Sequence, residues 1–362
     1  MNILYFAPIP FEEIKQRPQC IAEELSKCNK IYYVEPTVSL IRCLVKGGNE
    51  WHRKEKRINE NLHVLRLSGG FNFHEKMKIF DILGLGNIQE KLQIKHLVKW
   101  ADIIWIGYEG WYRLFLNDCK SIIVFDKMDD NVALTQNILI KMFLKKMRQG
   151  LEKRSNIIFV TAQKFYEDLK KNQNVFLIPN GVAFEKSNHD NIDYRNKGKK
   201  RFGYIGMISH WFDIEAIKKL ALENPESEII LVGPNYQPVI NLPNVFYYGK
   251  VPKEQVDNWI NTFDICLYPF KKSDLLDTID PVKIYEYLSC NKPIIAIHSK
   301  EMEKYDRKVY VYDSIDELIQ LSHQTLTPPF RTEEERDIFF KENSWANRVK
   351  NIVNILEEEL QR

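Results

Sequence analysis

Short, almost wholly apolar runs recur along this chain, and in most places a helical pattern separates one run from the next. Consecutive apolar positions are typical of a strand buried on both faces, as in the parallel sheets of α/β proteins. Strand–helix–strand order also favours parallel pairing with right-handed crossovers. We therefore predict doubly wound α/β structure, with strands at Ile3–Ala7, Ile31–Pro36, Leu62–Leu67, Asp102–Tyr108, Ser121–Asp126 and Asn156–Ala162, and again at Arg201–Ile205, Glu228–Val232, Val245–Tyr248, Ile265–Tyr268, Pro293–Ile297 and Val309–Tyr312.

The length of the chain and one polar stretch indicate two domains. At 362 residues the chain exceeds an ordinary single domain, and its alternating rhythm starts again at Arg201. Between the halves, Phe184–Arg201 is polar and almost lacks aliphatic residues, which is typical of a linker. We predict a first domain over 1–183, a linker over 184–200, a second domain over 201–340 and a C-terminal helix within 341–362.

Composition argues against several classes of protein. The sequence has 52 Lys and Arg residues and 49 Asp and Glu residues, a net charge of +3. This near balance does not indicate a nucleic-acid partner. The six cysteines form no C-x-x-C pair, so we expect reduced thiols in a cytoplasmic protein rather than metal ligands. The chain opens on a strand without a signal peptide, and no apolar run approaches the length of a membrane span.

The stretch DPVKIYEYLSCNKPIIAI, which starts at Asp280, carries the clearest site pattern. Asp280 is a good N-cap, so a helix is expected from Pro281 to about Ser289, with a strand after it. Lys283 and Glu286 are three residues apart and share one helix face. The helix N-terminus and Lys283 attract an anion, while Glu286 offers acceptor oxygens a turn further on. A diphosphate followed by a ribose diol suits this order, and a solvated Lys–Glu surface pair is the alternative.

This stretch resembles the donor-site segment of GT-B-fold glycosyltransferases, usually written P-x-K-x-x-E-Y-L-A-x-G-x-P-V-V. IPNGV, from Ile178, is similar to the hinge signature of that family, and GYIGMISHWFDIEAI, from Gly203, to the first strand–loop–helix of its donor domain. NVFYYGKVPKEQVDNWINTFDICLYPF, from Asn244, is similar to its base-binding turn and the next strand. QRPQ, from Gln16, and VFDKMDD, from Val124, are similar to a subgroup that builds bacterial surface polysaccharides, the teichuronic-acid glycosyltransferases among them.

The resemblance implies two Rossmann-like domains facing a cleft, with the C-terminal helix packing back on the first domain. It also implies that Lys283 holds the donor diphosphate, that Glu286 binds the ribose hydroxyls, and that backbone groups near Val251 pair with the base. The donor would be a UDP-sugar. We expect no metal or other cofactor to be required, because no Asp-x-Asp signature or His/Cys cluster appears.

Three positions near this segment have more than one interpretation. Gly206 ends a predicted strand, where a glycine lets the backbone approach a phosphate, but an ordinary strand–helix turn is the alternative. His210, in the loop that follows, can contact phosphate or sugar, or can be a solvated loop histidine. Many retaining members of the family carry a Glu eight residues before the ribose-binding Glu. Here that position holds Thr278, which leaves the stereochemical class open.

Acidic residues near strand ends in the first half are candidate general bases. Asp126, Asp129 and Asp130 follow one predicted strand, and Glu109 follows another. Turn and cap chemistry, which Asp favours, is the alternative. Arg17 precedes a predicted helix, where it can clamp an acceptor phosphate or form a structural salt bridge.

A basic amphipathic helix is expected over Asn137–Arg154, which holds six basic residues and one acidic residue. Its apolar residues share much of one face: Ile138, Leu139, Met142, Phe143 and Met147. Such a helix can lie on an anionic bilayer, which would make the protein a peripheral membrane binder. The alternative is that the apolar face packs on the domain's own sheet.

Together these features predict a glycosyltransferase that moves a sugar from a nucleotide-sugar to a glycan or lipid-linked acceptor in cell-surface polysaccharide synthesis. Two other functions stay open. A sugar-nucleotide epimerase of the same architecture would turn over without an acceptor, and a non-catalytic nucleotide-sugar-binding protein would bind without turnover.

Overall fold

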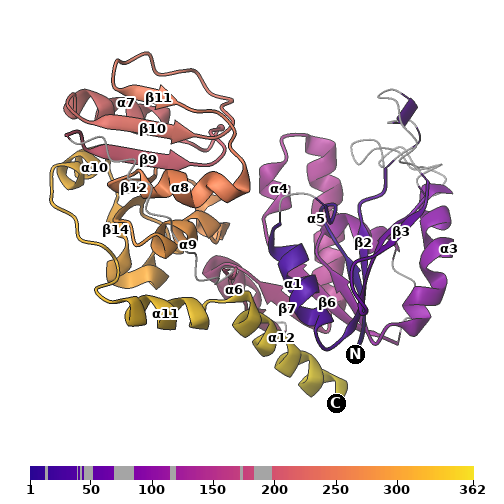
Figure 1. Cartoon of the computed structure of the whole chain (residues 1–362). Helices are drawn as coiled ribbons and strands as arrows, with labels where there is room; N and C mark the ends of the chain where they lie inside the picture. Colours follow the sequence, from indigo (N-terminus) through magenta and orange to yellow (C-terminus); the bar gives the residue numbers. More distant parts are fainter. Residues whose placement is uncertain are drawn as a thin grey trace. The chain divides into compact units, whose positions relative to one another are not determined.

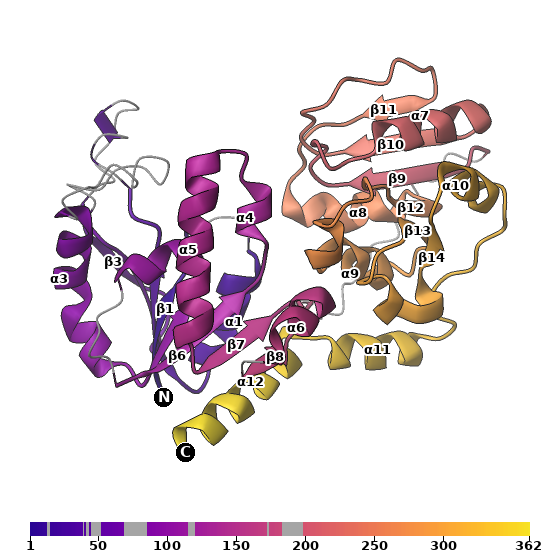
Figure 2. The same cartoon turned by 180° about the vertical axis from the view of Figure 1, so that it is seen from behind.

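The chain forms two units. The structure, a computed structural model, describes residues 1–12, 15–38, 40, 43–44, 52–68, 85–114, 120–171, 174–182 and 198–362. The first unit comprises Met1–Pro179 and Trp345–Arg362, and the second comprises Asn180–Ser344 (Figures 1 and 2). Apart from its last three residues, the predicted linker over 184–200 lies outside the described residues. The second unit begins before that stretch, at Asn180, because Asn180 is hydrogen-bonded to Asp280 within it.

The first unit is built on an eight-stranded sheet in the order β3-β4-β2-β1-β5-β6-β7-β8. Each pairing is parallel except that of β3 with β4 at the edge. The strands are β1 (Asn2–Phe6), β2 (Lys30–Glu35), β3 (Lys54–Arg57), β4 (Leu62–Arg66), β5 (Ile103–Ile106), β6 (Ile122–Lys127), β7 (Ile157–Val160) and β8 (Val175–Leu177).

Both faces of this sheet are covered. Ile3 and Tyr5 of β1 pack in one cluster with α1 (Arg17–Ser26) and α12 (Trp345–Leu360). Leu4 and Phe6 point to the opposite face and its separate cluster. The helices on that side are α3 (Leu85–Trp100), the 3-10 helix η2 (Glu109–Leu114), α5 (Ile138–Arg154) and α6 (Gln163–Leu169), and the short α4 (Asn131–Leu134) precedes α5. Alternate residues of one strand therefore enter two different cores, which is why the strands read as continuous apolar runs.

The second unit has a six-stranded sheet, parallel throughout, in the order β11-β10-β9-β12-β13-β14. Its strands are β9 (Arg201–Ile205), β10 (Glu228–Val232), β11 (Val245–Tyr247), β12 (Ile265–Tyr268), β13 (Ile294–Ile297) and β14 (Tyr310–Tyr312). Its helices are α7 (Ile214–Glu223), α8 (Val256–Asn261), α9 (Val282–Ser289), α10 (Ile315–Ser322) and α11 (Glu333–Glu342), with 3-10 turns η3 (Lys253–Gln255), η4 (Leu276–Thr278) and η5 (Glu303–Lys308). The prediction of two doubly wound parallel sheets is confirmed.

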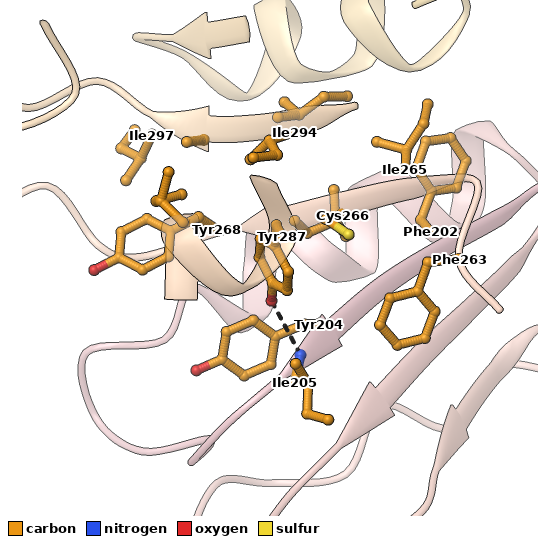
Figure 3. Close-up of a cluster of buried hydrophobic side chains, with 14 of the residues drawn as sticks. Phe202, Tyr204, Ile205, Phe263, Ile265, Cys266, Tyr268, Tyr287, Ile294 and Ile297 are labelled. Carbon is orange, nitrogen blue, oxygen red and sulfur yellow. Dashed lines mark hydrogen bonds between the residues drawn. The ribbon is translucent and has the colours of Figure 1, made fainter. Parts of the chain in front are cut away.

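One buried hydroxyl fixes α9 on this sheet. The ladder between β9 and β12 pairs only Phe202 and Gly203 of β9. Further along β9, the N–H of Ile205 donates instead to the hydroxyl of Tyr287, at 3.1 Å, and Tyr287 is fully buried (Figure 3). Helix α9 is therefore held against the carboxyl end of β9.

Candidate functional site

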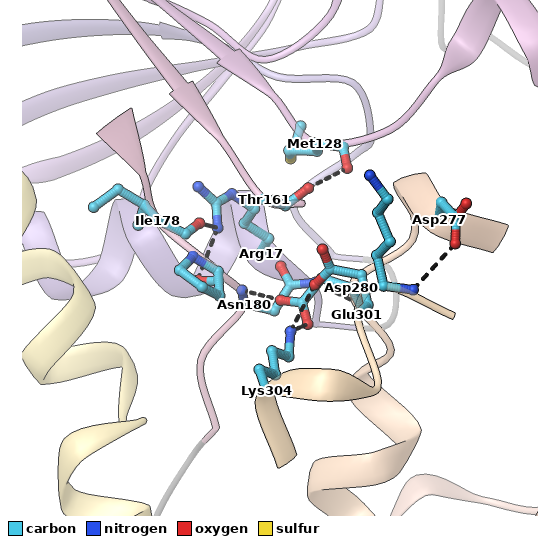
Figure 4. Close-up of polar contacts among 11 residues, drawn as sticks. Arg17, Met128, Thr161, Ile178, Asn180, Asp277, Asp280, Glu301 and Lys304 are labelled. Atoms are coloured by element: carbon cyan, nitrogen blue, oxygen red, sulfur yellow. Dashed lines mark hydrogen bonds and ion pairs between the residues drawn. The ribbon is translucent and has the colours of Figure 1, made fainter. Parts of the chain in front are cut away.

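Helix α9 differs at its start from the sequence-based expectation. It begins at Val282, and no side chain caps its N-terminus. The prediction that Asp280 is the N-cap is wrong: the Asp280 carboxylate accepts the backbone N–H of Asn180 at 2.5 Å and pairs with Lys304 (Figure 4). The C-terminal end agrees with the prediction, since α9 ends at Ser289, and Asn291 beyond it adopts a left-handed conformation with a φ of 52°. The first amides of α9 therefore have no side-chain cap to compete with a bound anion.

Gly206 and Lys283 lie against each other at the end of β9. Gly206 follows the last residue of β9 and has a φ of +151°, a conformation that other L-residues rarely adopt. A Cβ at Gly206 would stand 2.1 Å from Cε and 2.6 Å from Nζ of Lys283. The ammonium group of α9 thus reaches the carboxyl edge of the sheet, where open α/β sheets bind their ligands.

Two more glycines continue this edge. A Cβ at Gly233, which follows β10 and has a φ of +133°, would stand 2.0 Å from the carbonyl oxygen of Gly206. The N–H of Gly233 donates to the carbonyl of Gly249, after β11, at 2.6 Å. The backbones at three neighbouring strand ends are therefore packed closely, without side chains between them. Sequence reasoning missed Gly233, although a glycine directly after an apolar strand is the signal that identified Gly206.

The environment of Lys283 suits an anion. Desolvation lowers the pKa of this half-buried ammonium, Glu286 raises it, and Lys253 lowers it further. An ammonium that has lost part of its water gains more from a phosphate than a solvated one does. The geometry therefore places a positive charge, a helix N-terminus and a side-chain-free backbone at one point.

Glu286 lies one turn further along α9 and pairs with Lys253 of η3. The Glu286 side chain is 21% exposed, whereas that of Lys253 is 62% exposed. A lysine that meets solvent along most of its length can move away at small cost. The Glu286 carboxylate is therefore available to accept hydrogen bonds from ligand hydroxyl groups.

The other predicted donor-side residues are less engaged. The His210 side chain is exposed, and its ring contacts Trp211 at a centroid distance of 4.7 Å. Val251 is half-buried against the core of the second unit. Thr278, at the position where many retaining family members have a Glu, is buried, and its hydroxyl donates to the carbonyl of Leu275 at 2.7 Å. Threonine at that position has a local structural role.

In the first unit, Arg17 and Asp126 form a buried ion pair. Two guanidinium nitrogens of Arg17 contact the Asp126 carboxylate at 2.8–3.2 Å, and neither side chain is more than 4% exposed. The third nitrogen donates to the carbonyls of Ile178 and Pro179 at 2.8 and 3.2 Å (Figure 4). The pair ties the start of α1 to the end of β6 and to the last residues before the second unit. The structure favours the salt-bridge alternative for Arg17, and Asp126 is poorly placed to accept a proton.

Two of the remaining candidate bases are buried or engaged. Asp130 accepts the N–H of Ala133 at 3.1 Å as the N-cap of α4 and pairs with Arg148 at 3.0 Å. Glu109 is 1% exposed and accepts a hydrogen bond from Asn131 at 2.8 Å. Burial raises the pKa of Glu109 above its ordinary value, because its charged form is poorly solvated.

Asp129 is the exposed member of the set. Protein atoms crowded around it still raise its pKa through desolvation, while Arg17 opposes this rise. Of the candidate bases, Asp129 is therefore the most exposed to an incoming molecule.

Neither metal ligands nor a membrane span is evident in the described part of the chain. No group of three or more His, Cys, Asp or Glu side chains among those residues is arranged to hold a metal ion. Among the described helices, none combines the length and the apolar character that crossing a bilayer requires.

Sequence comparisons identify glycosyltransferase relatives. A family model described as "Glycosyl transferase-like" matches residues 212–354. The chain is 25% identical over 199 residues to the putative teichuronic acid biosynthesis glycosyltransferase TuaH of Bacillus subtilis (strain 168). This alignment covers 49% of the chain and 50% of TuaH, so the match spans about half the length of that curated relative.

Solved structures match the chain along nearly its whole length. Sucrose-phosphate synthase from Thermosynechococcus elongatus matches with a TM-score of 0.72 and 13% identity, over 98% of each chain. Anabaena HepE, in complex with UDP and glucose, matches with a TM-score of 0.66 and 12% identity, over 98% of this chain and 99% of HepE. The protein has the GT-B fold, and the resemblance to GT-B-fold glycosyltransferases that the motifs predicted is confirmed.

Proposed function

We propose that this protein is a glycosyltransferase whose donor is a nucleotide-sugar, with UDP as the nucleotide. The observation that carries the proposal is the contact of Lys283 with Gly206 at the carboxyl end of β9. It gives a diphosphate a cation, the uncapped amides of α9 and a backbone that it can approach closely. The structure of HepE with UDP and glucose supports the choice of a UDP-sugar.

In this reaction the bond between the anomeric carbon and the diphosphate oxygen breaks, and its electron pair stays on the departing UDP. Lys283 and the N-terminal amides of α9 stabilise the charge that develops on that oxygen. Glu286 accepts hydrogen bonds from the ribose hydroxyls after Lys253 swings away. Tyr287 positions both side chains, because its hydroxyl fixes α9 on β9.

Fewer contacts support our proposal for the acceptor side of the reaction. An inverting transfer needs a base to take the proton of the attacking hydroxyl, and Asp129 is the exposed candidate. A retaining transfer needs no such base, and the buried Thr278 supplies no carboxylate near the sugar. TuaH is named as a putative teichuronic acid biosynthesis glycosyltransferase, and this similarity supports a role in surface-polysaccharide synthesis. We propose that the acceptor is a glycan or a lipid-linked glycan, and that the protein works peripherally at the cytoplasmic face of the membrane.

The test is a panel of UDP-sugars incubated with the protein, with and without a membrane extract, in which free UDP and the acceptor mass are measured. We expect UDP release that depends on the extract and an acceptor that gains one sugar. Lys283→Ala should abolish most of this turnover, whereas Lys218→Ala, at an exposed lysine of α7, should not.

The other outcomes separate the alternatives. Conversion of one UDP-sugar into another without an acceptor would indicate an epimerase. Tight UDP binding without turnover on any donor would indicate a binding protein. Failure to bind any nucleotide would refute the proposed site itself.

A further inference from the structure

The first two turns of α5 expose apolar side chains. Ile138, Leu139 and Met142 are 66%, 51% and 64% exposed. The residues of α5 that are buried, Leu144 and Leu151, follow these three along the helix. Asn137 caps the helix by accepting the N–H groups of Leu139 and Ile140 at 3.0 and 3.2 Å. A well-capped helix end thus presents apolar side chains to solvent, with α4 packed beside it (Figure 2).

Three lysines surround these apolar side chains. Lys141, Lys145 and Lys146 are all exposed, and among the described residues none of the three forms an ion pair or a side-chain hydrogen bond. Lys145 and Lys146 follow Met142 by three and four residues, so they lie on its face of the helix. The sequence has no acidic residue from 131 to 151. We call Ile138, Leu139, Met142, Lys141, Lys145 and Lys146 the α5 patch.

The structure divides the amphipathic face that the sequence predicted. Phe143 and Met147 are half-buried and face the domain, as the packing alternative expected. Arg148 pairs with Asp130 and lies near Glu152, so its charge is largely satisfied. What stays free is the N-terminal end of the helix, where the apolar side chains and the unpaired lysines are together.

The composition of the α5 patch fits a lipid surface better than a protein. Protein interfaces are enriched in aromatic residues and Arg and depleted of Lys, whereas every cation here is Lys and no aromatic residue is present. Lysine stems bury beside apolar side chains while their ammonium groups stay at headgroup level. Ile138 and Leu139 lie at the start of α5, Lys141 and Met142 follow one turn later, and Lys145 and Lys146 follow after another turn. Apolar and cationic side chains therefore lie together at one end of the helix, as they do in helices that bind anionic lipid surfaces.

We propose that the α5 patch docks the protein on an anionic membrane surface. The inference deepens the proposed function, on which its purpose rests, because a lipid-linked acceptor lies in that membrane. Docking itself needs neither donor nor acceptor. It can therefore be tested separately.

The test is sedimentation with vesicles of phosphatidylcholine alone and of phosphatidylcholine mixed with phosphatidylglycerol, at low and high salt. We expect binding to the anionic vesicles that fades as salt rises. The double variant Met142→Gln/Lys146→Gln should bind anionic vesicles more than about tenfold more weakly than the wild type. The lost lysine accounts for about fivefold of this change, and the lost apolar side chain accounts for the rest.

The matched control uses α7, where Lys218 and Leu222 are also four residues apart and exposed. Lys218→Gln/Leu222→Gln makes the same chemical change away from the α5 patch, and it should bind vesicles like the wild type. All three proteins should bind UDP equally, which distinguishes failure of docking from failure of the donor site.

Three results would overturn the proposal. The first is a wild-type protein that does not pellet with anionic vesicles at low salt, which is also what a patch for a protein partner predicts. The second is a Met142→Gln/Lys146→Gln protein that binds as well as the wild type. The third is an equal loss in the α7 control, which would mean that overall charge rather than this surface drives binding.

Discussion

Gly206→Ala tests the contact on which the donor site depends. The new Cβ would stand 2.1 Å from Lys283 Cε, a separation that forces the lysine to move. The clashing atoms, Cε and Nζ, are at the flexible end of the Lys283 side chain, so moving them costs the fold little. The backbone strain of an alanine at a φ of +151° is a second cost, of about 1–3 kcal/mol. We therefore expect moderate destabilisation together with displacement of the ammonium group.

The displaced ammonium group should appear as a loss of affinity for UDP. A hydrogen bond to a charged group contributes about 1.5–3 kcal/mol, so UDP should bind roughly 10- to 150-fold more weakly. Gly198→Ala separates the two effects, because Gly198 has a φ of +145° and a Cβ there would meet nothing within 4 Å. Gly198→Ala should therefore show no more than the same backbone strain, and it should keep the wild-type affinity for UDP. Urea denaturation and calorimetric titration of UDP measure the two quantities.

A double variant supplies the decisive comparison. If alanine at 206 acts by moving Lys283, then Gly206→Ala/Lys283→Ala should bind UDP about as weakly as Lys283→Ala alone. Fully additive losses would mean that Gly206 acts through the backbone and not through the lysine. Wild-type affinity in Gly206→Ala would refute the reasoning altogether.

Three further predictions concern individual side chains. Glu286→Gln should weaken UDP binding by about 1.5–3 kcal/mol in titration. Glu223→Gln, which also removes the partner of an exposed lysine, should leave UDP binding unchanged. Equal effects of the two variants would contradict the proposal that Glu286 binds the ribose. Arg17→Ala leaves the Asp126 charge buried and unpaired, so urea denaturation should show a loss of about 3–5 kcal/mol, and a loss below about 1 kcal/mol would show that the pair is not structural. Burial raises the pKa of Glu109, so the folded state binds the carboxyl proton of Glu109 more tightly than the unfolded chain does. The free energy of unfolding should therefore fall as pH rises from the ordinary pKa of a glutamate to the raised pKa of Glu109. Glu109→Gln removes this fall, and identical stability–pH profiles for variant and wild type would contradict it.

The buried strands were predictable because burial on both faces leaves a direct mark on the sequence. Four strands of the second unit, β9, β10, β12 and β13, coincide with their predicted runs to within one residue. The strand β3, Lys54–Arg57, was missed, since all four of its residues are charged and exposed. Its lysines and arginine are typical of an edge strand that avoids further pairing, and such a strand has no apolar signal.

The partners of polar residues could not be predicted in the same way. Asp280 reads locally as a helix cap, yet its carboxylate binds the backbone of Asn180, which is 100 residues away in the sequence. Arg17 and Asp126 are separated by 109 residues. Sequence spacing within one helix identified Lys283 and Glu286 as neighbours, but only the folded sheet reveals that Lys283 lies on Gly206. Local periodicity carries information about one element, and these pairings join two.

The second unit interrupts the first, and this has a consequence for synthesis of the chain. Trp345, Val349, Ile352 and Leu356 of α12 are buried in the same cluster as Ile21 and Leu25 of α1. A ribosome makes α1 well before α12. The side chains of α1 that α12 covers therefore stay exposed until all of Asn180–Ser344 has been synthesised. Folding of the first unit is therefore completed from its far end. A nascent chain that stalls before Trp345 leaves the apolar side chains of α1 without the cover of α12, and we expect such a chain to bind chaperones or to aggregate.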